Sequence, residues 1–281
     1  MVRIVTDSGC DLPRDIINEY DIKVAPLTVT VSGKSYVETD LSPKEFWKMM
    51  KESKELPKTS QPSPGIFAKL FQKITDAGDE PFCITLSSKL SGSYQSATLG
   101  NQISGGKATV FDSLAASIAQ GIQVLKAARL AAVGKHVDEI LQILIKHRDS
   151  MKIIIPLYTL ENIVKGGRMS KFQGALAKFL NIKVILQGVN GEVKFLKKVR
   201  GLNKFKEAVL EIIDGITTNA DQIFGISHMD NEEDAEYFKK EIQKRCNAEV
   251  LITEMGPTIA TYAGLKAVSY THLTLPTICS V

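Results

Sequence analysis

The sequence contains few of the residue patterns that mark metal centres, nucleotide sites or catalytic nucleophiles. Its four histidines form no H-x-x-x-H pair, so a zinc or iron site is not expected. It has no Walker A loop and no G-x-G-x-x-G fingerprint, which argues against binding of ATP or NAD. It also lacks the G-x-S-x-G elbow that carries the nucleophile of many serine hydrolases. These absences favour a binding protein over an enzyme and predict no catalytic residue, no metal and no cofactor.

Long apolar runs are missing as well. No run approaches the ~20 residues needed to span a bilayer, and no signal segment precedes the first strand-like residues. The four cysteines are widely spaced and form no C-x-x-C pair, which is consistent with a reducing compartment. A net charge of +4 is too mild to indicate nucleic acid. We therefore expect a cytoplasmic protein without stable membrane insertion and without a nucleic-acid partner.

The first half of the chain alternates short β-branched runs with helical patterns. The predicted strands are residues 3–6, 23–31, 82–86 and 109–111. The predicted helices begin near Pro13, at the capping box 42–45, and at residues 66, 91 and 114. Such alternation is typical of a parallel sheet with helices on both faces.

The second half contains an antiparallel signal that the first half lacks. Asn190-Gly191 separates two strand-like runs, 182–187 and 192–199, and predicts a two-residue hairpin. Further predicted strands are 152–157, 223–227 and 249–253, and further helices are 203–216 and 232–245. We therefore predict two α/β domains, one over 1–150 with a parallel sheet and one over 151–264 with a mixed sheet.

Two hydroxyl-rich clusters are the most informative part of the sequence. They are residues 59–64 (TSQPSP) and 87–94 (SSKLSGSY), and each opens a helical pattern. Helix N-termini with extra hydroxyl donors suit an anion, here one held by neutral dipoles rather than by lysine. A single cluster of this kind more often caps a helix.

Three predicted strands end in the same way, which strengthens the case for a polar site. The endings are Thr6-Asp7-Ser8, Leu86-Ser87-Ser88 and Phe111-Asp112-Ser113. The carboxyl ends of parallel strands lie along one edge of a sheet, where ligands bind in α/β proteins. The alternative for each aspartate is that it caps the helix that follows.

A basic stretch follows the paired glycines Gly166-Gly167. Arg168 directly after them can form a bidentate contact with a carboxylate or phosphate. Lysine and arginine remain frequent from residue 165 to 206. This stretch is either a solvated face or a docking surface for an acidic partner, and the sequence leaves both open.

Taken together, these motifs resemble the DegV family, the fatty-acid-binding proteins that serve a bacterial fatty-acid kinase. The resemblance runs in order from residue 2 to about 264. The motifs that carry it are Thr6-Asp7-Ser8, Asp11-Leu12-Pro13, residues 59–64 and 87–96, Asp112-Ser113, Leu160-Glu161, Gly166-Gly167-Arg168 and Lys198-Val199-Arg200-Gly201.

The resemblance implies two α/β domains with a long-chain fatty acid between them. It implies that Thr59 and Ser91 bind the carboxylate, that Arg168 lies at the site mouth and that Arg200 faces the kinase. A separate kinase subunit would phosphorylate the carboxylate, so the chain itself would be non-catalytic. The complete set of predicted ligand-binding residues is Ser8, Thr59, Ser60, Ser91, Gly92, Ser113, Arg168 and Thr261. Candidate tunnel residues, with core packing as the alternative, are Leu176, Phe179, Leu180, Ile182, Ile185 and Leu186.

The sequence departs from the family pattern in two places. The family usually has a histidine near the ligand head where this chain has Tyr262, so only Thr261 is carried over. After Gly264 the resemblance stops, and residues 265–281 resemble a foreign junction or cloning-derived tail. If so, an element that closes the fold would be missing.

Two other functions fit parts of the sequence. One is an enzyme that moves phosphate on a small polar substrate with Asp7, Asp112 and Arg168. The other is an interaction module that uses the basic stretch, whose partner binding salt would abolish.

Overall fold

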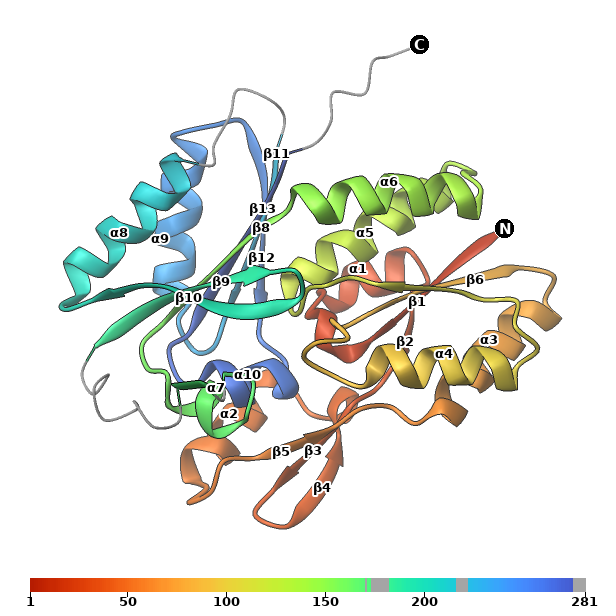
Figure 1. Cartoon of the computed structure of the whole chain (residues 1–281), viewed down its shortest axis with the longest axis horizontal. Coiled ribbons are helices and arrows are strands. Elements are labelled where there is room, and N and C mark those ends of the chain that lie inside the picture. The colour runs from red at the N-terminus through yellow and green to blue at the C-terminus, as the bar shows by residue number, and fades with distance from the viewer. Residues whose placement is uncertain (170, 173–181, 216–221, 275–281) are drawn as a thin grey trace.

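A computed structural model of the chain describes residues 1–169, 171–172, 182–215 and 222–274 (Figure 1). The strands are β1 (Val2–Asp7), β2 (Lys23–Ala25), β3 (Thr28–Val31), β4 (Lys34–Val37), β5 (Lys58–Ser60), β6 (Glu80–Thr85), β7 (Thr109–Asp112), β8 (Lys152–Leu157), β9 (Lys183–Val189), β10 (Glu192–Val199), β11 (Gln222–His228), β12 (Ala248–Glu254) and β13 (Val268–Thr274). The α-helices are α1 (Arg14–Glu19), α2 (Pro43–Glu52), α3 (Pro64–Asp76), α4 (Ser93–Ile103), α5 (Ile118–Ala132), α6 (Val137–Ser150), α7 (Glu161–Lys165), α8 (Leu202–Asp214), α9 (Glu232–Gln243) and α10 (Pro257–Ala263). Two 3₁₀ turns, η1 (Ser8–Cys10) and η2 (Glu38–Asp40), follow β1 and β4.

The first lobe is built on a four-stranded parallel sheet in the order β2-β1-β6-β7. Neighbouring residues of β1 face opposite sides, as the pleat of a strand requires. Ile4 packs in the cluster that contains α5, whereas Val5 packs with Phe67 and Phe71 of α3. Helices therefore cover both faces, and the predicted parallel sheet is confirmed.

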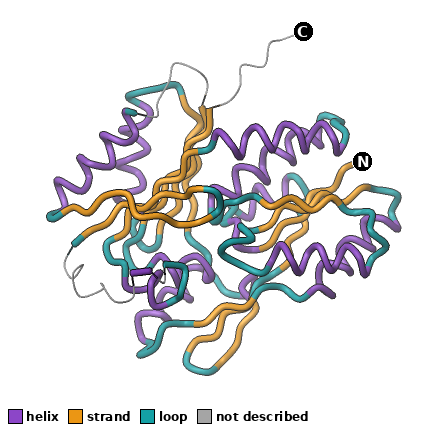
Figure 2. Tube along the Cα trace, in the orientation of Figure 1, coloured by secondary structure: helices purple, strands orange, loops and turns teal. Residues whose placement is uncertain are grey.

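The second lobe is built on a six-stranded mixed sheet in the order β10-β9-β8-β13-β11-β12. Figure 2 shows the strands of both lobes in orange, with helices in purple beside them. β11 and β12 are parallel, and the other pairings are antiparallel. Asn190 and Gly191 both have positive φ, at 52° and 82°, so they form the predicted hairpin turn between β9 and β10. One face of this sheet packs on α8 and α9, and α5 reaches β11 and β13 on the other.

The segment after Gly264, which the sequence predicts to be an atypical tail, contains a strand. Val268–Thr274 forms β13, which pairs with β8 and β11 in the middle of the second sheet. Val268 and Tyr270 alternate into the apolar core, and this period of two is what fits the segment to a strand. Residues 265–274 are therefore part of the second lobe, and the sheet contains its central strand. Residues 275–281 lie outside the described part of the chain.

A small third sheet connects the two lobes. It has the order β4-β3-β5 and comes from the first 60 residues. Val29 of β3 and Trp47 of α2 pack with Leu157 and Met255 of the second lobe. The chain leaves the first large sheet before α6 and enters the second at β8, near the predicted boundary at residue 150. The segment that contains β3 and α2 nevertheless packs on the second lobe. Among the described helices, none has the length and apolar content needed to cross a bilayer.

Close contact between α5 and β11 predicts an effect of one glycine on stability. A Cβ at Gly225 would lie 2.5 Å from Ile118 Cγ1 and 2.8 Å from Ile122 Cδ1, both of them fully buried side chains. We expect Gly225→Ala to lower the free energy of unfolding by about 1–3 kcal/mol because the core is overpacked. Urea denaturation measures this change.

The matched control is Gly65→Ala near the start of α3, where the nearest heavy atom is Ser63 Oγ at 3.9 Å. That variant should be neutral or slightly stabilising, since alanine is the better helix residue. Equal stability of the two variants would contradict the close packing of the lobes.

Candidate functional site

A cavity of about 150 Å³ lies where the two lobes meet. Most of its wall is aliphatic, and prominent members are Leu27, Leu90, Ile153, Ile155, Leu157 and Ile259. The polar side chains in the wall include those of Thr59, Gln61, Ser91, Arg168 and Tyr262. A mostly apolar cavity with a few convergent polar groups suits a ligand that has a long apolar part and a small polar head.

Thr59 reaches the cavity because of its register in β5. It pairs with Val29 of β3, and its neighbours Lys58 and Ser60 are exposed on the opposite face. Its Oγ1 lies 2.6 Å from the phenolic Oη of Tyr262 on α10. Two hydroxyl groups, 203 residues apart in the chain, therefore meet at one point of the cavity wall.

The two predicted hydroxyl clusters meet through a glycine. A Cβ at Gly92 would lie 2.4 Å from Gln61 Nε2, so the side chain of the first cluster packs on the backbone of the second. Ser91 lies directly before this glycine, and its Oγ is 3.0 Å from Ser93 Oγ. It also accepts a hydrogen bond from the Ser93 amide, at 3.2 Å. Thr59, Ser91 and Gly92, three of the predicted ligand-binding residues, thus line the same cavity.

Arg168 lines the cavity and connects the lobes. Its guanidinium Cζ is 4.2 Å from the ring centroid of Tyr262, a cation–π contact. Nη1 donates to the Gly166 carbonyl at 2.7 Å, and Nε donates to the Leu90 carbonyl at 3.3 Å. A Cβ at Gly166 would lie 2.4 Å from Tyr262 Cδ1, so the first glycine of the pair makes room for the tyrosine ring.

The hydroxyls of two predicted ligand-binding residues, Ser8 and Ser113, form hydrogen bonds with other protein groups and do not reach the cavity. Ser8 Oγ donates to the Glu38 carboxylate and accepts a hydrogen bond from the Leu27 amide at 2.9 Å. Ser113 Oγ exchanges hydrogen bonds with the Ala115 backbone, at 3.1 and 3.2 Å. Neither residue is part of the cavity wall. The Ser8 hydroxyl connects η1 to Leu27 and Glu38, and the Ser113 hydroxyl closes the turn after β7.

Ser60 and Thr261 also lie away from the cavity wall. The pleat of β5 directs Ser60 to solvent, opposite to Thr59. On α10, Ile259 and Tyr262 share the cavity face at a spacing of three, which leaves Thr261 on another face. Thr261 Oγ1 donates to the Pro257 carbonyl at 2.8 Å within the helix. The sequence analysis predicted Thr261 and not Tyr262 as a binding residue. The helical period, which places Tyr262 on the same face as Ile259, could have distinguished the two positions.

The predicted tunnel residues give a similar result. Ile182, Ile185 and Leu186 do not belong to the cavity wall. Ile185 and Leu186 are fully buried in β9 and pack in the apolar cores, which was the alternative interpretation. The other three candidates, Leu176, Phe179 and Leu180, lie outside the described residues.

The predicted partner residue Arg200 is exposed in the connection between β10 and α8. Several lysines of the surrounding basic stretch form ion pairs with acidic neighbours. Lys165 pairs with Glu161, and Lys197 pairs with Glu211 at 3.0 Å. These paired lysines agree with a solvated face, whereas Arg200 forms no ion pair with another residue of the described part of the chain.

The aspartates of the predicted phosphotransfer site accept hydrogen bonds from backbone amides of the loops after the strands. Asp7 is fully buried and accepts hydrogen bonds from the Leu86 amide at 2.8 Å and the Gly9 amide at 3.2 Å. Burial raises the pKa of Asp7 to about 6. Asp112 accepts from the Ser88 amide at 3.1 Å. Neither carboxylate lines the cavity with Arg168, so the structure does not bring these three side chains together.

Two other buried carboxyl groups hold the helix that carries Tyr262. Asp11 Oδ1 accepts from the Gly256 amide at 2.9 Å. Glu38 accepts from the Thr258 amide at 2.6 Å and from Thr258 Oγ1 at 3.0 Å. Both carboxyls belong to the first lobe, whereas Gly256 and Thr258 form the start of α10. The position of Tyr262 therefore depends on contacts more than 200 residues apart in sequence.

The protonation state of Asp11 follows from its environment. Burial raises its pKa to about 8. Ser117 Oγ lies within hydrogen-bond distance of both Asp11 Oδ2 and Ser227 Oγ, although one hydroxyl has only one proton to donate. Both contacts form when Ser117 donates to Asp11 Oδ2 and accepts a hydrogen bond from Ser227 Oγ. Among the residues that the structure describes, no group of three His, Cys, Asp or Glu side chains is arranged to hold a metal ion.

This geometry predicts how stability depends on pH. Because the folded pKa of Asp11 lies near 8 and its ordinary value is 3.8, the native state binds its proton more tightly than the unfolded state. The stabilisation is complete below about pH 4 and is lost as pH rises through about 8. In Asp11→Asn, the amide donates to Ser117 and its oxygen accepts from Gly256, so the loss of stability between pH 5 and 8 should be smaller.

The measurement is the free energy of unfolding from urea titrations at several pH values. Asp15→Asn on α1 is the control, since that carboxyl is exposed. The same pH slope in Asp11→Asn as in the native chain would contradict a protonated Asp11.

Comparison with known proteins gives one consistent family. Residues 1–274 match the model of a family described as "Uncharacterised protein, DegV family". The DegV domain-containing protein YejH of Lactococcus lactis is 38% identical over 265 residues, which cover 94% of this chain and 95% of that protein. A DegV domain-containing protein of Clostridium acetobutylicum is 36% identical over 268 residues, covering 95% of this chain and 96% of that one.

Solved structures share the fold. A DegV family protein of Thermus thermophilus, described as fatty acid binding, has a TM-score of 0.90 at 30% identity, covering 98% of this chain and 99% of that one. A DegV lipid binding protein of Thermotoga maritima has a TM-score of 0.88 at 32% identity, covering 98% of each chain. The fatty acid kinase B3 protein of Streptococcus pneumoniae, loaded with linoleic acid, has the same fold at 24% identity, with a TM-score of 0.85 and coverage of 98% and 100%.

Proposed function

We propose that this chain, which belongs to the DegV family, binds a long-chain fatty acid in the cavity between its two lobes. The observation that carries the proposal is an aliphatic cavity whose wall contains the hydroxyls of Thr59, Ser91 and Tyr262. A fatty acid needs both parts, an apolar wall for its tail and hydrogen-bond donors for its carboxylate. The similar proteins of Thermus thermophilus and Thermotoga maritima are described as fatty acid binding and lipid binding, which supports the proposal.

In this proposal, the carboxylate accepts hydrogen bonds from Thr59 and Ser91. Tyr262 is the third donor, because its hydroxyl already lies 2.6 Å from Thr59 Oγ1 and can turn to the same ligand oxygen. Hydrogen bonds to a charged acceptor contribute roughly 1.5–3 kcal/mol each. The nearby guanidinium of Arg168 adds positive charge at the mouth. Gly92 permits the close approach of the loop, and the other predicted binding residues have no part in this site.

The tail supplies most of the affinity. Each buried methylene contributes ~0.8 kcal/mol, so about 14 of them give roughly 11 kcal/mol before the losses of association. The hydroxyls mainly determine which end of the ligand lies at the mouth. A cavity with the reverse composition would select a short polar acid.

The chain presents the bound acid to a separate kinase and performs no chemistry itself. The kinase brings the nucleotide, and a carboxylate oxygen attacks its terminal phosphate to give an acyl phosphate and a nucleoside diphosphate. Support for this partner comes from the family motif that contains Arg200, which is exposed and accessible to a second protein. A cytoplasmic location, where such a kinase finds its nucleotide, belongs to the same proposal.

The first test is the native mass of the purified protein. After expression in bacteria, native mass spectrometry should show a co-purifying component with the mass of a long-chain fatty acid, which extraction then identifies. A ligand-free protein that also takes up no fatty acid on incubation would end the proposal.

The second test removes the head-group donors. Thr59→Val with Ser91→Ala leaves the apolar wall intact and deletes two hydroxyls, so fatty-acid affinity should fall at least tenfold, equivalent to 1.4 kcal/mol or more. Displacement of a fluorescent fatty acid measures the affinity. Thr30→Val with Ser35→Ala is the control, since this hydroxyl pair on the β3–β4 hairpin makes the same kind of contact, at 2.9 Å, outside the cavity. Equal affinity of the two double variants would contradict the assigned head-group site.

A further inference from the structure

One predicted motif has no part in the head-group site. Phe111-Asp112-Ser113 ends β7, and Leu114 directly after it lies in the cavity wall. A second cavity, of about 230 Å³, begins on the other side of this residue. Four residues line both cavities, namely Leu114, Ile153, Gly188 and Gly191. Two of them are glycines, so Leu114 and Ile153 supply the side chains of the partition.

The two cavities differ in character. In addition to the partition, the second cavity is lined by the polar side chains of Arg148, Lys152, Gln187 and Asn190 and by fewer apolar residues, Met151, Ile154 and Val189. An acyl chain in the first cavity is surrounded by aliphatic groups, whereas a chain that passed the partition would meet charged and amide groups. Each further methylene beyond the partition would therefore gain much less than one inside it.

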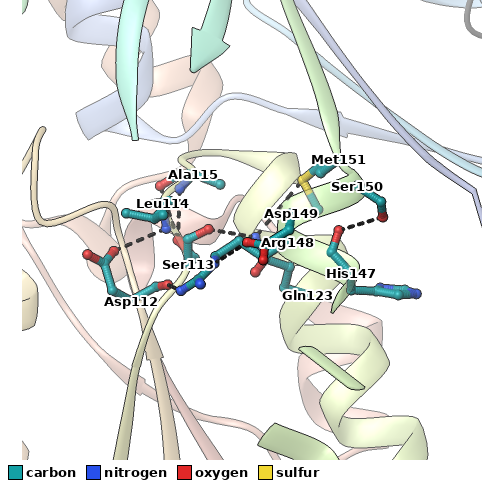
Figure 3. A network of polar contacts seen from close by, with 10 residues as sticks. All are labelled: Asp112, Ser113, Leu114, Ala115, Gln123, His147, Arg148, Asp149, Ser150 and Met151. Carbon is teal, nitrogen blue, oxygen red and sulfur yellow. Dashed lines mark hydrogen bonds and ion pairs between the residues drawn. The ribbon is translucent and has the colours of Figure 1, made fainter. Parts of the chain in front are cut away.

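The backbone at Leu114 is held in an unusual conformation. Its φ is +50°, in the left-handed region that a leucine rarely adopts. The Leu114 amide donates to Asp112 Oδ1 at 3.1 Å, and the Ala115 amide donates to Ser113 Oγ at 3.1 Å (Figure 3). Both side chains of the motif thus close the turn that presents Leu114 to the partition. Strain of this kind persists only where the surroundings fix the backbone.

The surrounding helices brace the same turn. Arg148 of α6 donates to the Asp112 carbonyl at 3.1 Å, and its guanidinium lies 5.0 Å from the Phe111 ring centroid. Gln123 of α5 donates to the Ser113 carbonyl at 3.1 Å (Figure 3). From the other lobe, the hairpin tip packs on the leucine, since a Cβ at Gly191 would lie 3.0 Å from Leu114 Cδ2.

We propose that Leu114 determines the acyl length that the protein accepts, by closing the partition between the aliphatic cavity and the polar cavity. Asp112 is its positioning residue. This inference rests on the proposed binding of a fatty acid and adds to it a limit on the tail. Ile153 forms the other side of the partition, so both side chains set the limit together.

The experiment measures affinity against chain length. Saturated fatty acids from 12 to 22 carbons displace a fluorescent fatty acid from the native chain, from Leu114→Ala and from Ile153→Ala. In the native chain, affinity should rise about fourfold per methylene and then stop rising at a defined length. In both alanine variants the affinity should keep rising for at least two further carbons, because the removed side chain leaves apolar space at the partition, and by less than fourfold per methylene, because the polar cavity begins there.

The matched control is Leu144→Ala on α6, a fully buried leucine that lines neither cavity. It loses the same atoms and should keep the native length limit. In Asp112→Ala the chain length at which affinity stops rising should become less sharply defined, because the Leu114 amide loses its acceptor. The affinity for a short acid should not fall, because the head-group site is unchanged. Having Ile153→Ala as a second variant keeps the test decisive if Leu114→Ala does not fold.

The outcomes separate this inference from the proposed function. An unchanged length limit in Leu114→Ala or Ile153→Ala, with fatty acid still bound, would overturn the role of the partition alone. A shift of the limit in Leu144→Ala as large as in Leu114→Ala would also overturn it, since general loosening would then explain the shift. No binding of any acid by the native chain would instead end the proposed function.

Discussion

The attachment of α10 to the first lobe is the contact on which the candidate site depends. Asp11 and Glu38 are buried, and backbone amides at the start of the helix donate to both. Burying a carboxyl group without such donors costs much free energy, so these hydrogen bonds hold the start of the helix in place. Because Tyr262 lies five residues after Pro257 in the same short helix, its contact with Thr59 is a consequence of this attachment.

Neutral hydroxyl groups, rather than a lysine, surround the proposed carboxylate. Arg168 lines the same cavity, but two of its N–H groups already donate to backbone carbonyls, and its guanidinium makes a cation–π contact with the ring of Tyr262. The guanidinium therefore contributes a fixed field at the mouth more than a direct ion pair. In the proposed function, a head group held in this way keeps its negative charge and remains a nucleophile, which suits its phosphorylation by a second protein.

The sequence was informative where local rules decide the structure. The Asn190-Gly191 turn, the capping box at Ser42 and the parallel sheet all follow from turn chemistry, capping and hydrophobic pattern. Thr59 and Ser91 were found because both lie in hydroxyl-rich loops. Glu38 was missed since nothing nearby in sequence indicates that it meets α10. The central position of β13 was missed for a similar reason, because pairing partners of a strand are not encoded in its own residues.

The single tryptophan of the chain lies at the junction described above. Trp47 is buried, and its indole Nε1 donates to the Met255 carbonyl at 3.1 Å, directly before Gly256 and α10. Its ring centroid is 6.2 Å from that of His228 on the neighbouring strand. The tryptophan fluorescence of this protein consequently comes from one indole beside the helix that carries Tyr262. The molecule thus contains its own optical reporter for that region, and no dye or engineered label is needed to observe it.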